Sequence, residues 1–175
     1  MKTRLKAEAD AGRMVNMETE NARREEARKA IEGLARDPAV QRMKAFPQHG
    51  RVSTYAHCLR VARLSCELAI RWGWDVDLRR LARGALLHDY YLYDWHTRGD
   101  HLHGYHHPRI AAEKAGADFR LDEREKGIIR THMWPLTLFH PPTSREGWLV
   151  CLADKICTAR EWRDGKRRPR RDGRK

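Results

Sequence analysis

An aspartate interrupts the most apolar stretch of the chain. Asp154 lies within WLVCLADKICTA, where nearly every other residue is apolar and the spacing is helical. A carboxylate in a buried helix is costly unless it is paired or bound to a metal ion. Any fold of this chain must therefore bring to Asp154 either a cation, such as Lys155 or an arginine from elsewhere, or further metal ligands.

Other ionisable groups also continue apolar helix faces: His57, the adjacent pair His88 and Asp89, and His132. Alone, His57 or His132 could be an ordinary helix-end histidine. Because separate helices each bring a histidine or an aspartate to the same kind of place, we expect one metal site. Imidazole and carboxylate ligands together suit Mn, Fe, Co, Ni or Zn.

Apolar residues recur with helical spacing along most of the chain. We expect a surface helix over residues 17–37, core helices over residues 53–72 and 144–162, and further helices that begin near residues 77, 108 and 122. Ser53, Ser144 and the pair Asp122 and Glu125 are predicted helix caps. No sustained alternation typical of strands is visible, so the predicted fold class is all-α. Residues 1–16 are expected to form a loose arm, and residues 90–105 a loop or lid.

Composition divides the chain into an N-terminal arm and helix (1–47), a core domain (48–162) and a basic tail (163–175). The formal net charge is +12, and eight of the thirteen tail residues are basic. Because the tail has no apolar content, we expect it to be disordered, and it could bind nucleic acid weakly and without sequence preference. The rest of the chain is only mildly basic, which argues against a protein that coats nucleic acid.

The sequence also lacks the signals of membrane and secreted proteins. No apolar run is long enough to span a bilayer, and the N-terminus has no apolar core of a secretory signal. The four cysteines are not arranged as CxxC pairs and lie inside apolar helical patterns: Cys58, Cys66, Cys151 and Cys157. These features predict reduced, buried thiols, no membrane association and a cytoplasmic location.

The order of His57, the pair His88 and Asp89, and Asp154 resembles the H…HD…D signature of the HD-domain metal-dependent phosphohydrolases. The segments TYAHCLRVA, GALLHDY and CLADKI resemble the three signature helices of that family. The resemblance covers residues 48–160. It implies an all-α domain of about five core helices that hydrolyses a phosphate ester with a metal-activated water, the substrate being a nucleotide or a related phosphorylated small molecule.

Two further histidines resemble those of HD subfamilies with two metal ions. By that resemblance the ligands form two sets with Asp89 shared: His57, His88, Asp89 and Asp154 for one ion, and Asp89, His107 and His132 for the other. His106 could replace His107, but Pro108 favours His107 by fixing it at a helix mouth. The expected cofactor is one or two divalent ions of Mn, Fe, Zn, Co or Ni, with Mg as an option at one position.

Catalytic and substrate-binding roles are assigned by the same resemblance. Asp89 would orient the attacking water and accept its proton, and Lys155 would offer a point charge to a phosphate oxygen. His49, Arg60 and Arg109 are further candidates for binding the substrate. The remaining histidines, His96, His101 and His103, are expected to face solvent or to make hydrogen bonds. The aromatic residues could line a pocket for a base or pack a loop against the core: Tyr90, Tyr91, Tyr93, Trp95 and Trp134.

Two other functions fit the same residues. Some relatives with such a two-metal centre hold iron and carry out oxygen chemistry, so that iron content and oxygen-dependent activity would identify an oxygenase. A non-catalytic regulator could instead keep the metal site and bind a nucleotide or nucleic acid tightly without turnover. The residues do not indicate an oligomeric state.

Overall fold

Helices account for nearly all regular structure in the computed structural model, which describes residues 2–49, 52–94 and 102–167. Within these residues the α-helices are α1 (Lys2–Ala35), α2 (Pro38–Gln41), α3 (Thr54–Arg71), α4 (Leu78–Leu87), α5 (His103–Phe119), α6 (Glu123–Thr131) and α7 (Arg145–Arg167). A short 3-10 helix, η1 (Arg42–Ala45), follows α2. The predicted all-α class is confirmed.

Capping residues set several helix ends as the sequence predicts. The Ser53 hydroxyl caps α3, and Gly73 follows that helix at φ +63°, a conformation that glycine adopts without strain. Asp122 and Glu125 form the predicted reciprocal capping box of α6. The Ser144 hydroxyl accepts a backbone N–H in the first turn of α7.

Four expectations of local structure are corrected. Residues 2–16 are not loose but continue α1, because the segment is rich in the helix-forming residues Ala, Lys, Glu and Met. Helix α5 begins at His103, so Pro108 lies inside it rather than at its start. Helix α7 runs to Arg167 instead of ending near residue 162, and residues 168–175 of the predicted tail lie outside the described residues. Two short antiparallel strands, β1 (Pro47–His49) and β2 (Val52–Ser53), are too brief to show an alternating pattern.

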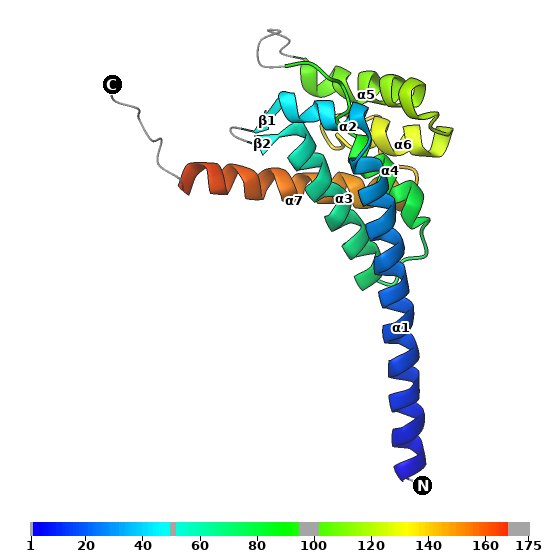
Figure 1. Ribbon diagram of the computed structural model, residues 1–175. Helices are drawn as coiled ribbons and strands as arrows, with labels where there is room; N and C mark the ends of the chain where they lie inside the picture. Colours follow the sequence, from blue (N-terminus) through cyan, green and yellow to red (C-terminus); the bar gives the residue numbers. More distant parts are fainter. Residues whose placement is uncertain (1, 50–51, 95–101, 168–175) are drawn as a thin grey trace.

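Helices α3 and α4 form the centre of the fold (Figure 1). Helix α3 packs against α1, α4 and α7, and α4 also contacts α6, which α5 covers. Gly84 on α4 permits the close approach of α6, because a Cβ atom there would lie 2.9 Å from Cγ2 of Ile128. The C-terminal ends of α4 and α6 therefore meet, and the histidine that follows each helix, His88 and His132, lies with its ring centroid 4.8 Å from the other.

Helix α1 covers α3 and α4 with one half and projects beyond the body with the other (Figure 1). The apolar residues of the packed half, Ala27, Ile31 and Ala35, are buried. At 1.5 Å per residue the whole helix is about 50 Å long. No helix in the described part of the chain combines the length and the apolar character that a membrane span requires.

Candidate metal centre

Five helices bring six ionisable side chains to one buried place. His57 lies in the first turn of α3, His107 lies in α5, and Asp154 lies in the middle of α7. His88 and Asp89 directly follow α4, and His132 directly follows α6. None of the six side chains belongs to a residue that is more than 7% exposed. The six predicted metal ligands are therefore together in the structure.

The first group, which we call the first triad, consists of His57, His88 and Asp154. One ligand atom from each residue lies within 4.8 Å of the others. Oδ1 of Asp154 is 3.1 Å from Nε2 of His57 and 3.8 Å from Nε2 of His88. Two imidazole nitrogens therefore converge on one carboxylate oxygen, an arrangement in which all three could bind a single cation.

The second triad consists of Asp89, His107 and His132. Oδ1 of Asp89 lies 3.1 Å from Nε2 of His107 and 3.6 Å from Nε2 of His132. Oδ2, the other oxygen of Asp89, lies 3.4 Å from Nε2 of His88 in the first triad. Asp89 thus faces both triads, one oxygen to each, as the predicted bridging ligand would.

The orientation of three imidazoles is set through Nδ1. His88 donates from Nδ1 to the carbonyl oxygen of Ala85 at 2.8 Å, and His132 donates to that of Ile129 at 2.7 Å. Both carbonyls belong to the last turn of the preceding helix, so the helix end itself fixes the ring. Nδ1 of His57 lies 3.0 Å from a Glu161 carboxylate oxygen. A proton held at Nδ1 leaves Nε2 as the metal-binding nitrogen.

Two buried polar atoms of the cluster make no hydrogen bond: Nε2 of His88 and Oδ1 of Asp89. An unsatisfied buried polar group costs about 1–3 kcal/mol. Both atoms are electron-pair donors that point into the cluster, and both belong to the triads. A divalent cation would satisfy them together, so the residues present fit a metal ion.

The pKa values reflect the pairing of carboxylates with imidazoles in a dry environment. Burial by itself lowers the pKa of His57, but its hydrogen bonds to Asp154 and Glu161 outweigh burial and raise that pKa to about 10. Burial raises the pKa of Asp154, yet the hydrogen bond with His57 and the charge of His88 hold it well below its usual range. Burial and the neighbouring His88 lower the pKa of His132 to about 3. His132 is therefore neutral at pH 7, the form that binds metals.

Gln48 holds the bridging carboxylate. Its side-chain amide nitrogen donates to Oδ2 of Asp89 at 2.5 Å, and its amide oxygen accepts hydrogen bonds from the hydroxyls of Tyr91 and Thr54. The sequence analysis missed Gln48 and chose its neighbour His49, whose backbone lies in β1 but whose side chain lies outside the described ones. The small sheet brings Gln48 to the cluster, and the role of His49 stays a prediction.

Glu161 is the second residue that the sequence analysis missed. It lies seven residues after Asp154, two helical turns along the same face of α7, and this spacing could have revealed it. Its carboxylate contacts His57 and also accepts a hydrogen bond from Arg60 at 2.8 Å. Arg60, expected to bind substrate, is thus tied to the support of a metal ligand.

Lys155 contacts both halves of the cluster. Its ammonium group donates to Oδ2 of Asp154 at 2.9 Å and to the carbonyl oxygen of His132 at 2.8 Å. The ion pair that the sequence offered as an alternative to a metal is therefore present. It does not replace the metal site, because it uses only one oxygen of Asp154 and leaves the atoms of His88 and Asp89 unsatisfied.

Helix α5 settles the choice between adjacent histidines. His107 is 5% exposed and belongs to the second triad, whereas His106 is exposed. Arg109 lies about 200° around the helix from His107 and pairs with Glu113 at 3.3 Å on the exposed surface. The structure therefore does not bring Arg109 to the cluster, contrary to its predicted role in substrate binding.

The aromatic residues near the cluster have separate roles. Tyr90 is fully buried, donates to Asp118 at 2.8 Å and packs on Phe119, so it belongs to the core. The Tyr91 ring lies beside that of Tyr93, with centroids 4.9 Å apart. Trp134 packs on Trp148 of α7. Trp95, His96 and His101 lie outside the described residues, as does the side chain of His103.

All four cysteines are buried and free, as predicted. Cys58 lies within 4.8 Å of ligand atoms of His88 and Asp89. Because both partners already belong to the two triads, this combination adds no independent metal position. Three of the thiols pack in the apolar core, those of Cys58, Cys66 and Cys157, whereas Cys151 Sγ donates to the carbonyl oxygen of Trp134 at 3.0 Å.

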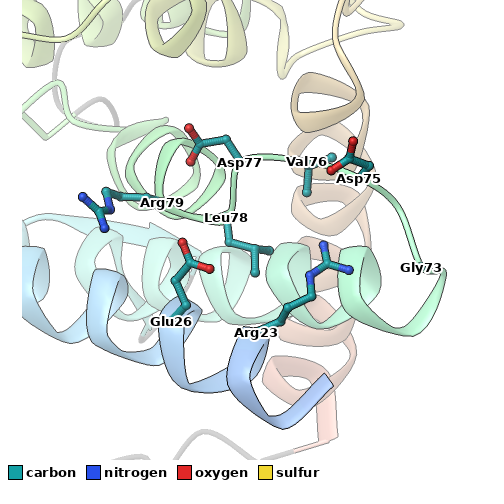
Figure 2. Close-up of a pocket in the computed structure, with 8 residues that line it drawn as sticks. All are labelled: Arg23, Glu26, Gly73, Asp75, Val76, Asp77, Leu78 and Arg79. Carbon is teal, nitrogen blue, oxygen red and sulfur yellow. The ribbon is translucent and has the colours of Figure 1, made fainter. Parts of the chain in front are cut away.

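A surface hollow of about 540 Å³ lies away from the cluster, between α1 and the segment that joins α3 to α4 (Figure 2). Two of its polar groups are already used by the fold. Arg23 donates to the carbonyl oxygen of Trp74 at 2.7 Å, and Asp77 caps α4. The chemistry of the protein is therefore expected at the buried cluster, not at this hollow.

The fold and the cluster define an all-α protein with buried groups of histidine and aspartate that could hold metal ions. The family model of the HD domain matches residues 54–159, and the chain belongs to that family. Most HD-domain proteins are metal-dependent hydrolases. Searches of curated proteins and of solved structures gave no match.

Proposed function

We propose that the protein hydrolyses a phosphate ester with two divalent ions, one at each triad. The observation that carries the proposal is the position of Asp89, whose two oxygens face histidines of different triads at 3.1 and 3.4 Å. The unsatisfied atoms of His88 and Asp89 support it, because they provide donors on both sides of the bridge. Membership of a family of metal-dependent hydrolases agrees with this reaction.

Different residues of the chain have different roles in the proposed hydrolysis. Divalent ions bound there would supply the positive charge that lowers the pKa of a water molecule and neutralises phosphoryl oxygens. Asp89 orients the attacking water and takes up its proton. The Lys155 ammonium group has three hydrogens, of which two are used by Asp154 and the His132 carbonyl. The third remains for a phosphoryl oxygen, and the side chain is 39% exposed, which permits that contact.

The proposed substrate is a nucleotide or a related phosphorylated small molecule. The Tyr91 ring lies between the Tyr93 ring and the His107 ring, with centroid distances of 4.9 and 5.8 Å. Because Tyr93 is only partly buried, it offers an aromatic surface on which a base could stack, with the Tyr91 ring linking it to His107 of the second triad. The cytoplasmic location and weak nucleic-acid binding by the basic tail stay predictions.

The test is phosphate release from a broad panel of nucleotides, cyclic dinucleotides and sugar phosphates. The full chain is stripped with a chelator and reloaded separately with Mn, Fe, Co, Ni, Zn or Mg. We expect release with at least one ion, loss on chelation, and loss in Asp154→Asn. Arg109→Ala is the matched surface control and should keep full activity.

The same experiment separates the two alternatives. Oxygen consumption that requires iron, without phosphate release, would identify an oxygenase. Tight nucleotide binding by the loaded protein without turnover would identify a regulator. Either result, or full activity in Asp154→Asn, contradicts the hydrolase proposal.

A further inference from the structure

Glu161 is a buried carboxylate that the proposed reaction does not use. Its side chain is 3% exposed, although its partner Arg60 is 52% exposed. One carboxylate oxygen accepts from Arg60 at 2.8 Å, and the other lies 3.0 Å from Nδ1 of His57. The opposite nitrogen of His57 faces Asp154 at 3.1 Å. An unbroken line of contacts therefore runs from the solvent-exposed guanidinium to a ligand of the first triad.

This support distinguishes His57 from the other histidines whose Nδ1 partner is known. His88 and His132 donate to neutral backbone carbonyls, whereas His57 donates to an anionic carboxylate. A carboxylate behind a metal-binding histidine fixes the ring and makes its Nε2 a stronger donor. His57 is thus the better electron donor of these three imidazoles.

The two triads also differ in their own negative charge. The first triad contains the carboxylate of Asp154 and also faces one oxygen of Asp89. The second triad contains Asp89 alone. The cations beside the first triad, Arg60 and Lys155, have side chains that are 52% and 39% exposed, so solvent screens their charge. The greater negative charge of the first triad and the contact of Glu161 with His57 therefore both favour tighter metal binding at the first triad.

We propose that Glu161 is a positioning residue which, through His57, makes the first triad the tighter of the two metal positions, so that the first triad fills before the second. The inference rests on the proposed two-ion centre. It does not depend on which substrate is hydrolysed. Arg60 belongs to this support, because it holds Glu161 against His57.

The test is a titration of the metal-free full chain with Co²⁺ alone, followed by visible absorption and by competition with a chelator. The wild-type chain should show a tight and a weak class of Co²⁺ sites with distinct spectra. Glu161→Leu should weaken the tight class by about 10- to 100-fold and leave the weak class unchanged. Glu161→Gln keeps an oxygen that can accept from Nδ1 of His57 but removes the negative charge, so it should restore the spectrum and only part of the affinity.

Glu125 provides a matched control. Like Glu161, it is buried, and it likewise pairs with an arginine, Arg83, at 2.6 Å. Glu125 caps α6 and, within the described part of the chain, makes no hydrogen bond or ion pair with a histidine of the triads. Glu125→Gln should lower thermal stability and leave both Co²⁺ affinities unchanged. Equal losses in Glu125→Gln and Glu161→Leu would mean that Glu161 acts only through stability, which overturns the proposal.

Other results of the Co²⁺ titration also test the role of Glu161. An unchanged tight class in Glu161→Leu, or equal weakening of both classes, overturns the role of Glu161 but leaves hydrolysis intact. A wild-type chain that binds no Co²⁺, Mn²⁺ or Zn²⁺ overturns the proposed function as well. If Glu161→Leu does not fold, nitrogen NMR of His57 in the wild type and in Glu161→Gln decides, since the proposal requires a protonated Nδ1 in both.

Discussion

Asp89 Oδ1 lies 3.1 Å from Nε2 of His107, a residue of a different helix, and makes no hydrogen bond of good geometry with it. Both atoms belong to the second triad, whose three members could together bind one cation. Because Oδ2 of the same carboxylate faces His88, Asp89 is the one side chain whose loss should affect both metal positions.

Replacement of Asp89 by alanine is therefore expected to abolish most metal binding. The purified chain should fall from about two divalent ions to fewer than one, because a shared ligand is removed. Elemental analysis after desalting measures the ratio of metal to protein. Arg109→Ala, whose side chain pairs with Glu113 on the surface, should retain both ions, and an unchanged ratio in Asp89→Ala would exclude a bridge.

Replacement of His132 by alanine should remove only one ion. His132 belongs to the second triad, while the first triad keeps all three of its own members. The same elemental analysis should give about one ion per chain. Two ions in His132→Ala would show that the second triad is not a metal position.

The metal-free protein should lose stability as the pH rises from about 7 to 10. The pKa of His57 is raised to about 10 in the folded chain, while an unfolded histidine has a pKa near 6.5. The folded state therefore holds more protons in this interval, and its free energy of unfolding falls as the pH rises, by at most about 1.4 kcal/mol per pH unit for one proton. Urea unfolding at several pH values measures the slope, which should be flatter in His57→Gln.

Removal of the Lys155 charge should impair catalysis less than removal of a metal ligand. We expect Lys155→Ala to raise KM or lower kcat by about tenfold, because one point charge near the phosphate is lost. Asp154→Asn should lower kcat on the order of a thousandfold or more, because a metal ligand is lost. Steady-state kinetics on the best substrate of the panel provides the comparison, and equal losses would assign Lys155 to the metal centre itself.

Gly84→Ala should destabilise the fold by about 1–3 kcal/mol through overpacking. The new Cβ would lie 2.9 Å from Ile128, at the contact that brings the ends of α4 and α6 together. Gly127→Ala is the control: nothing lies within 4 Å of its Cβ position, and it should stabilise α6 by about 0.5–1 kcal/mol. Thermal and urea unfolding of both variants test the pair, and a neutral Gly84→Ala would mean that α4 and α6 can separate without cost.

The sequence predicts the helical class and the places of Asp154, His88 and Asp89 because those signals are local, whereas the complete set of six side chains follows from the resemblance to HD-domain proteins. Asp154 was out of place in an apolar helix, and His88 and Asp89 extended an apolar face. His107 was preferred over His106 for the proline that follows it, and the preference agrees with its burial. The reason was incomplete, because α5 begins four residues before His107. Burial follows from the face of the helix rather than from its start.

Other features of the site depend on tertiary packing instead. They are the contacts of Gln48 and Glu161 with the cluster and the surface position of Arg109. Gln48 reaches Asp89 across 41 residues, by way of strands that are too short to give a sequence pattern. Glu161 reaches His57 across 104 residues. Polar residues of these types usually face solvent, so only the assembled fold distinguishes them from ordinary surface groups.

The distance along the chain between His57 and Asp154 has a consequence for how the protein matures. These first-triad residues are 97 positions apart, and Asp154 lies on α7, which follows the other described helices in the sequence. During synthesis from the N-terminus, an emerging chain has His57, His88 and Asp89 long before it has Asp154. The complete first triad can form only when α7 packs on α3. A metal ion that binds all three of its side chains would therefore bind late in folding and hold α7 against α3. Binding of that ion to the first triad then requires that the chain has been made through Asp154 of α7.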